Sequence, residues 1–112
     1  MKHAEWLQLR EPVAPRALIA RIAPLLAAHV EWESLPRTDA FVEASELLLR
    51  RVLAGNLVAR ASALDLLASD ACVTYAFEAA SDEPATIGDR ASAAMRRIAG
   101  IASEYAPDAR SR

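Results

Sequence analysis

Few residues of this 112-residue chain have the chemistry and the spacing that catalysis or metal binding requires. Of the two histidines, only His29 has a carboxylate at helical i,i+4 spacing, on Glu33. Carboxylate-bridged metal sites in helical bundles use a Glu-x-x-His unit on each of two helices, and the sequence contains no such unit. We therefore expect His29 to lie at a helix end against Trp32, and we expect no metal, no cofactor and no catalytic residue.

The other reactive groups also point away from enzyme chemistry. Cys72 is the only cysteine, and its place among apolar residues at helical spacing predicts a buried, unreactive thiol. The three glycines are far apart, so the chain has no glycine-rich phosphate loop. Arg96 and Arg97 are predicted to lie on a solvated helix face rather than to clamp a phosphate. The sequence therefore predicts a protein that is not an enzyme.

Composition limits the class of protein and its partners. Alanine, leucine, arginine and glutamate dominate while β-branched and aromatic residues are scarce, which favours helix over strand. The net charge is −2 and no basic block is present, so a nucleic-acid partner is disfavoured. The N-terminus carries charges where a secretory signal needs an apolar run, and no window approaches the roughly 18 apolar residues of a membrane span. We expect a soluble, cytoplasmic protein without a membrane partner.

Residues 57–80 are predicted to form a long helix around which the other helices pack. A turn of about 100° per residue gives this helix two apolar seams on opposite sides. The seam predicted to face the core contains Leu57, Ala61, Leu64, Ala68, Ala71, Cys72, Tyr75 and Ala79. The second seam contains Ala59, Leu66, Val73 and Phe77, with Asp70 among them.

A helix that is apolar on two sides needs a cover on both sides. The candidate covers for the second seam are a second copy of the chain and the N-terminal segment that carries Trp6, Leu7 and Leu9. In either case Asp70 is expected to lose water and to need an arginine or a hydroxyl partner such as Thr74.

Two helices are predicted before the long one. The first starts at Pro15 and continues towards Trp32, and Pro24 inside it is expected to cause a kink because proline lacks an amide hydrogen. The second spans about residues 39–54 and stops at Gly55. Its outer face is predicted to carry Glu43, Glu46 and Arg50, the last two as an i,i+4 ion pair.

The last helix is predicted to begin after the turn sequence at residues 81–84. Its apolar residues are spaced alternately by four and three and form one seam. This seam contains Ile87, Ala91, Ala94, Ile98, Ile101 and Tyr105. Pro107 ends the helix, and residues 107–112 are expected to be a frayed tail.

These elements predict a single all-α domain over residues 1–112. Short connections make successive helices antiparallel, so we expect a four-helix antiparallel bundle with a short N-terminal arm or helix over residues 1–14. Leu64 and Ile98 lie at the middle of their seams and are predicted to be among the most buried residues.

The stretch 66–78 reads Leu-Leu-Ala-Ser-Asp-Ala-Cys-Val-Thr-Tyr-Ala-Phe-Glu. It resembles the Leu-Leu-Ala-Gly-Asp-x-Leu-Leu-x-x-Ala-Phe helix of the all-α polyprenyl diphosphate synthases, with Ser69 where that family usually has glycine. The aspartate-rich motifs that hold magnesium and diphosphate in that family do not occur in this chain. The resemblance therefore implies a helical packing pattern and self-association rather than prenyl transfer.

Two functions remain. The first is a non-enzymatic helical module that associates with itself or with another protein, because the long helix offers more apolar surface than three small neighbours cover. We expect a homodimer whose interface contains Leu66, Asp70, Val73 and Phe77. The second is a small helical binding protein, or a degenerate relative of an isoprenoid-type enzyme, that holds an apolar ligand between helices. A cavity lined by Leu66, Val73 and Phe77 is expected in that case.

Overall fold

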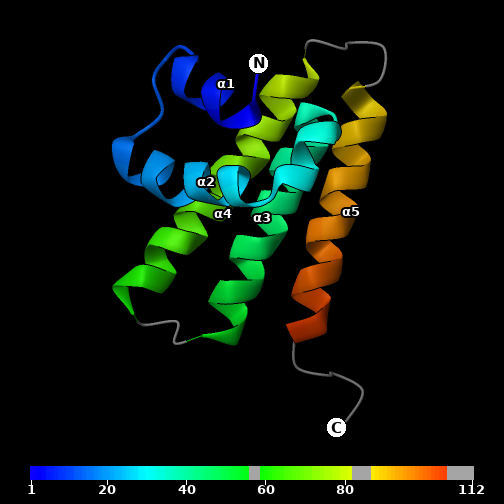
Figure 1. Ribbon diagram of the computed structural model, residues 1–112. Coiled ribbons are helices and arrows are strands. Elements are labelled where there is room, and N and C mark those ends of the chain that lie inside the picture. Colours follow the sequence, from blue (N-terminus) through cyan, green and yellow to red (C-terminus); the bar gives the residue numbers. More distant parts are fainter. Residues whose placement is uncertain (56–58, 82–86, 106–112) are drawn as a thin grey trace, which may run out of the picture.

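In a computed structural model of the protein, the regular elements of the described chain are all helices. The structure describes residues 1–55, 59–81 and 87–105. In the last of these segments, side chains are described from residue 91 onward. The elements are α1 (His3–Leu9), α2 (Arg16–Ala28), the 3₁₀ helix η1 (Val30–Ser34), α3 (Arg37–Ala54), α4 (Arg60–Ala80) and α5 (Ile87–Tyr105) (Figure 1). The predicted all-α class is confirmed, since no strand occurs in these three segments. Leu57 and the predicted tail at 107–112 lie outside them.

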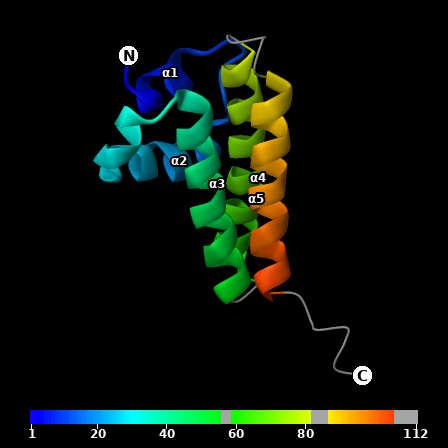
Figure 2. The ribbon, with the colours of Figure 1, turned by 90° about the vertical axis from the view of Figure 1, so that its right-hand side faces the viewer.

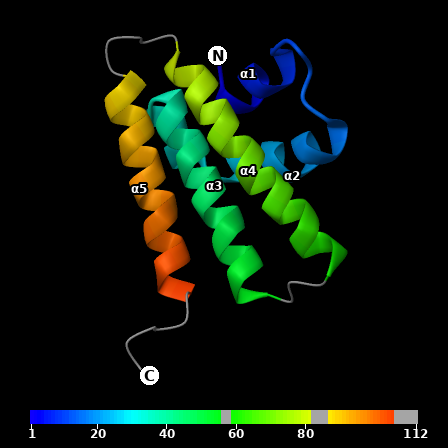
Figure 3. The same cartoon turned by 180° about the vertical axis from the view of Figure 1, so that it is seen from behind.

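The three long helices α3, α4 and α5 run down, up and down again beside one another (Figures 1 and 3). α2 does not follow this direction: it lies across the long helices in each of the three views (Figure 2 gives the side view). The predicted four-helix antiparallel bundle is therefore not confirmed as an arrangement within the chain. Arg21 of α2 donates to the Asp65 carboxylate of α4 at 3.1 Å, which ties the crossing helix to α4.

The first main helix is shorter than predicted. α2 ends at Ala28, and a 3₁₀ helix that contains Trp32 follows after His29. The His29 amide donates to the Leu25 carbonyl, which closes the last turn of α2. Pro24 lies inside α2 on an exposed position and does not end the helix.

The core lies where α1, α2, α3 and α4 meet. Its largest fully buried side chains are Leu7, Ile22, Leu26, Phe41, Ser45, Leu48 and Cys72. The prediction that Leu64 and Ile98 are among the most buried residues is wrong, because both are only half-buried. Leu64 lies one turn from the start of α4 and lines a pocket, while Ala94 and Ile101 are the buried residues of α5 from residue 91 to residue 105.

The N-terminal segment is a structural part of this core rather than a loose arm. Leu7 is fully buried, and the Trp6 ring lies 5.4 Å from the Phe41 ring, centroid to centroid. Arg10 forms an ion pair with Glu78 and stacks over the Tyr75 ring at 4.7 Å. The segment thus contacts the C-terminal half of α4 through Arg10.

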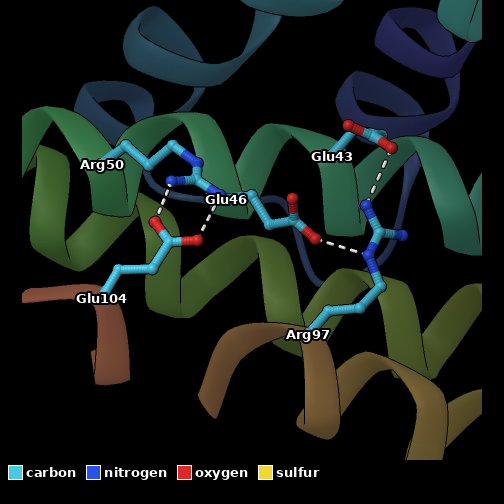
Figure 4. A network of polar contacts seen from close by, with 5 residues as sticks. All are labelled: Glu43, Glu46, Arg50, Arg97 and Glu104. Carbon is cyan, nitrogen blue, oxygen red and sulfur yellow. Dashed lines mark hydrogen bonds and ion pairs between the residues drawn. The ribbon is translucent and has the colours of Figure 1, made fainter. Parts of the chain in front are cut away.

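Polar side chains join α5 to α3 (Figure 4). Arg97 donates to Glu43 at 2.8 Å and also pairs with Glu46, and Arg50 pairs with Glu104. The predicted i,i+4 pair of Glu46 and Arg50 is therefore replaced by two pairs between helices. These three α3 residues face α5 rather than open solvent, because α5 packs against this side of α3.

Candidate functional site

The core seam predicted for the long helix is found in the C-terminal part of α4. Ala68, Cys72, Tyr75 and Ala79 are buried, as the helical spacing predicts. Towards the N-terminus of the helix the cover is incomplete, since Ala71 and Leu64 are half-buried and Ala61 is exposed.

The second seam is divided between a covered half and an open half. Phe77 is half-buried and packs against the core, and Val73 is also half-buried. Leu66 remains 51% exposed. The buried carboxylate expected at Asp70 is not present in the single chain, because Asp70 is exposed. The N-terminal segment contacts α4 through Arg10 at Tyr75 and Glu78, whereas Leu66 stays exposed, so this segment does not cover Leu66.

We name the uncovered side of this helix the α4 open face. It consists of six exposed residues: Arg60, Ala63, Leu66, Leu67, Asp70 and Thr74. Leu67 is 58% exposed and was not among the predicted interface residues. The sequence signal that could have found it is the alternate three- and four-residue spacing of Ala63, Leu67, Asp70 and Thr74, which places these residues on one helix face.

A pocket of about 480 Å³ adjoins the α4 open face, between the start of α2 and the middle of α4. It is lined by Pro15, Ala17, Leu18, Leu64, Leu67, Asp70, Ala71, Thr74 and Tyr75. Apolar side chains make most of its wall, with one carboxylate and two hydroxyl groups among them. The cavity predicted between Leu66, Val73 and Phe77 is not this pocket, since none of those three residues lines it.

Cys72, the reactive side chain nearest to this region in sequence, is not available as a nucleophile. It is fully buried, and burial raises the pKa of its thiol to about 12. A thiol with such a pKa stays protonated at neutral pH, and the thiolate is the nucleophilic form. The prediction of an unreactive, buried cysteine agrees with this environment.

Both histidines have structural roles. The His29 ring stacks on the Trp32 ring with centroids 4.0 Å apart, and its Nδ1 lies 2.9 Å from the Leu25 carbonyl oxygen. The buried His3 accepts a hydrogen bond from Arg37 at Nδ1 and lies 2.9 Å through Nε2 from the Trp32 carbonyl oxygen. These contacts use both ring nitrogens of His3 to fasten α1 to η1 and α3.

Other kinds of site find no support in the described residues. No group of three or more histidine, cysteine, aspartate or glutamate side chains there could hold a metal ion. Among the helices of residues 1–55, 59–81 and 87–105, none is both long and apolar enough to cross a membrane.

No protein-family model, curated protein or solved structure matches this chain. The α4 open face combines two neighbouring exposed leucines, Leu66 and Leu67, with an adjoining pocket. Large apolar side chains that cluster on a surface mark interaction sites more often than isolated ones do.

Proposed function

We propose that this protein is a non-enzymatic helical module that works by association with a second copy of itself through the α4 open face. The observation that carries the proposal is the pair Leu66 and Leu67, two neighbouring leucines that are each more than half exposed in the middle of the longest helix. Full burial of a leucine side chain contributes about 1.5–3 kcal/mol, so two leucines in each copy supply a substantial driving force.

Asp70 fits this proposal as a polar member of the interface. It lies one turn after Leu66 on the same helix, so a partner that covers Leu66 and Leu67 also removes water from Asp70. A carboxylate that loses water needs a charged or hydrogen-bonding partner. Val73 and Phe77 contribute less than the sequence predicts, because each is already half-covered within the chain.

The proposal also gives the long helices an additional neighbour. α3, α4 and α5 pack antiparallel within the chain, and α4 of a second copy would add a fourth long helix on the open side of α4. In this proposal α4 of the second copy takes the place of the fourth long helix, and the dimer as a whole contains six long helices.

Light scattering on the purified protein tests the association directly. We expect a dimer mass for the wild type, and a monomer mass for Leu67→Glu with an unchanged helical circular dichroism spectrum. Met95→Glu is the matched control, because Met95 is also more than half exposed but lies on α5. A wild type that stays monomeric at its highest soluble concentration would contradict the proposal.

A ligand-binding function is the second candidate, and the pocket between α2 and α4 supports it. Its volume of about 480 Å³ falls within the range of small-molecule sites. Five residues of its wall belong to the stretch that resembles polyprenyl diphosphate synthases, so an isoprenoid alcohol is a suitable probe. These five are Leu67, Asp70, Ala71, Thr74 and Tyr75.

A farnesol titration followed by amide NMR separates the two candidates. Saturable shifts at Leu18 and Ala71 in a monomeric protein would favour ligand binding. Under the association proposal, farnesol produces no saturable shifts, and the wild type is a dimer without ligand.

A further inference from the structure

We infer that the second copy binds with its α4 antiparallel to the first, so that Arg60 of each copy pairs with Asp70 of the other. This inference rests on the proposed self-association and names its geometry. Its basis is the pattern of exposed residues along α4, namely Arg60, Ala63, Leu67, Asp70 and Thr74. Their spacing of three, four, three and four residues makes a single straight seam, as in helices that pair along their length.

The charges of this seam favour one direction of pairing. Arg60 stands at its N-terminal end, and Asp70 stands ten residues later, about 15 Å along the helix axis. A parallel, in-register partner would set arginine against arginine and aspartate against aspartate. An antiparallel partner centred at position 65 sets Arg60 against Asp70, and the two-fold axis produces this pair twice.

The apolar residues of the seam fit the same alignment. Centring at position 65 also places Ala63 of one copy opposite Leu67 of the other. A small residue facing a large one lets two helices approach closely while the leucine is covered. Charge and size therefore agree on one antiparallel alignment of the two α4 helices.

The remaining charges of α4 are already used within the chain. Asp65 pairs with Arg21 of α2, and Glu78 pairs with Arg10. No ion pair to Arg60 or to Asp70 occurs among the residues that the structure describes. These two exposed groups are the charges of α4 that remain for a partner.

Charge reversal tests this pairing without weakening the helix. Arg60→Glu places an acidic residue in the first turn, where the helix dipole favours it, and Asp70→Arg replaces a weak helix former by a strong one. Each single variant opposes like charges at both contacts, so we expect the dimer dissociation constant to rise by about tenfold or more. An equimolar mixture of the two single variants, and the double variant, restore opposite charges at both contacts and should dimerise like the wild type.

Light scattering and native mass spectrometry give the readout, with Arg96→Glu on α5 as the control for a change in net charge. Weakened single variants whose mixture forms a heterodimer support the inference. A dimeric wild type whose affinity does not change in the single variants overturns the pairing and leaves the proposed self-association standing. Single variants that are weakened but not rescued by mixing also overturn the pairing. A monomeric wild type overturns both.

Discussion

Ser45 of α3 and Ser69 of α4 exchange hydrogen bonds across the centre of the core. The Ser45 hydroxyl lies 3.0 Å from the Ser69 carbonyl oxygen, and the Ser69 hydroxyl donates to the Ser45 carbonyl oxygen at 2.9 Å. The two hydroxyl oxygens are 3.1 Å apart, and both side chains are buried. Small side chains at this crossing let the two helices approach closely, because the interaxial distance depends on the residues at the contact.

We predict that loss of one hydroxyl is tolerated and that added bulk is not. Ser69→Ala should lower the free energy of unfolding by about 1 kcal/mol, since the carbonyl partner can keep its helical hydrogen bond. Ser69→Leu should lower it by about 1–3 kcal/mol or more, because the crossing has no room for the side chain. Denaturant unfolding measures both, with the exposed Ser92→Ala as control. A smaller loss for the leucine than for the alanine variant would contradict close packing here.

The sequence predicts the helices better than it predicts their directions. Gly55 ends α3, and apolar spacing locates α4 and α5, because turn residues and periodicity act locally. The course of α2 depends on contacts distant in sequence, such as the pair of Arg21 with Asp65. Such pairs leave no periodic signal, so α2 could not be oriented from the sequence.

The candidate site shows the same limit. Helical spacing places Leu66 on the second seam, but it does not show which neighbouring element covers each part of that seam. Phe77 is partly covered within the chain, whereas Leu66 and Asp70 are open, and the difference arises from tertiary packing. Leu67 was missed because its angle falls between the two predicted seams.

We predict that Arg10 fastens α1 to α4 mainly through its planar guanidinium. The group lies 5.4 Å from the Trp6 ring centroid and 4.7 Å from that of Tyr75, and it pairs with Glu78. Arg10→Met should lower the free energy of unfolding by about 1–2 kcal/mol, given the usual strength of cation–π contacts. Arg10→Lys should retain only part of this stability, because an ammonium cannot stack on two rings as a guanidinium does.

Hydrogen exchange of the α1 amides distinguishes local release from global unfolding in these variants. In Arg10→Met we expect the amide of Leu7 to exchange faster than global unfolding allows. The amide of Leu48 in α3 should still exchange only through global unfolding. Arg16→Met, at an exposed position of α2, is the control. Equal stability of wild type and Arg10→Met would show that the stacked guanidinium contributes nothing.

We predict that the ion pairs between α3 and α5 are weak singly and sensitive to salt. Arg97 contacts Glu43 and Glu46, and its side chain is 39% exposed, so solvent screens both pairs. Arg97→Met should cost about 1 kcal/mol or less. The difference in stability between wild type and variant should shrink in 1 M NaCl, because the Debye length falls to about 3 Å at that salt concentration. Arg96→Met serves as the neighbouring control, and a salt-independent difference would indicate a packing effect instead.

The last prediction concerns Cys72 and the alkaline side of the stability profile. Burial raises the pKa of this thiol from its ordinary value near 9 to about 12. Between these pH values the unfolded chain loses the thiol proton and the folded chain keeps it. Stability therefore falls as pH rises through this window, by at most about 1.4 kcal/mol per pH unit from this group. Below pH 9 the thiol is protonated in both states and has no such effect.

Two measurements isolate the thiol. Burial also raises the pKa of Tyr75, which acts in the same direction, so the wild type is compared with Cys72→Ala, and the variant should show the shallower decline above pH 9. Alkylation by iodoacetamide at pH 8 should proceed only through unfolding and should accelerate with denaturant as the unfolded fraction grows. Because Cys72 lies at the centre of α4 beside Ser69 and Tyr75, alkylation of the native protein at the rate of a free thiol would mean that α4 does not face the core as described.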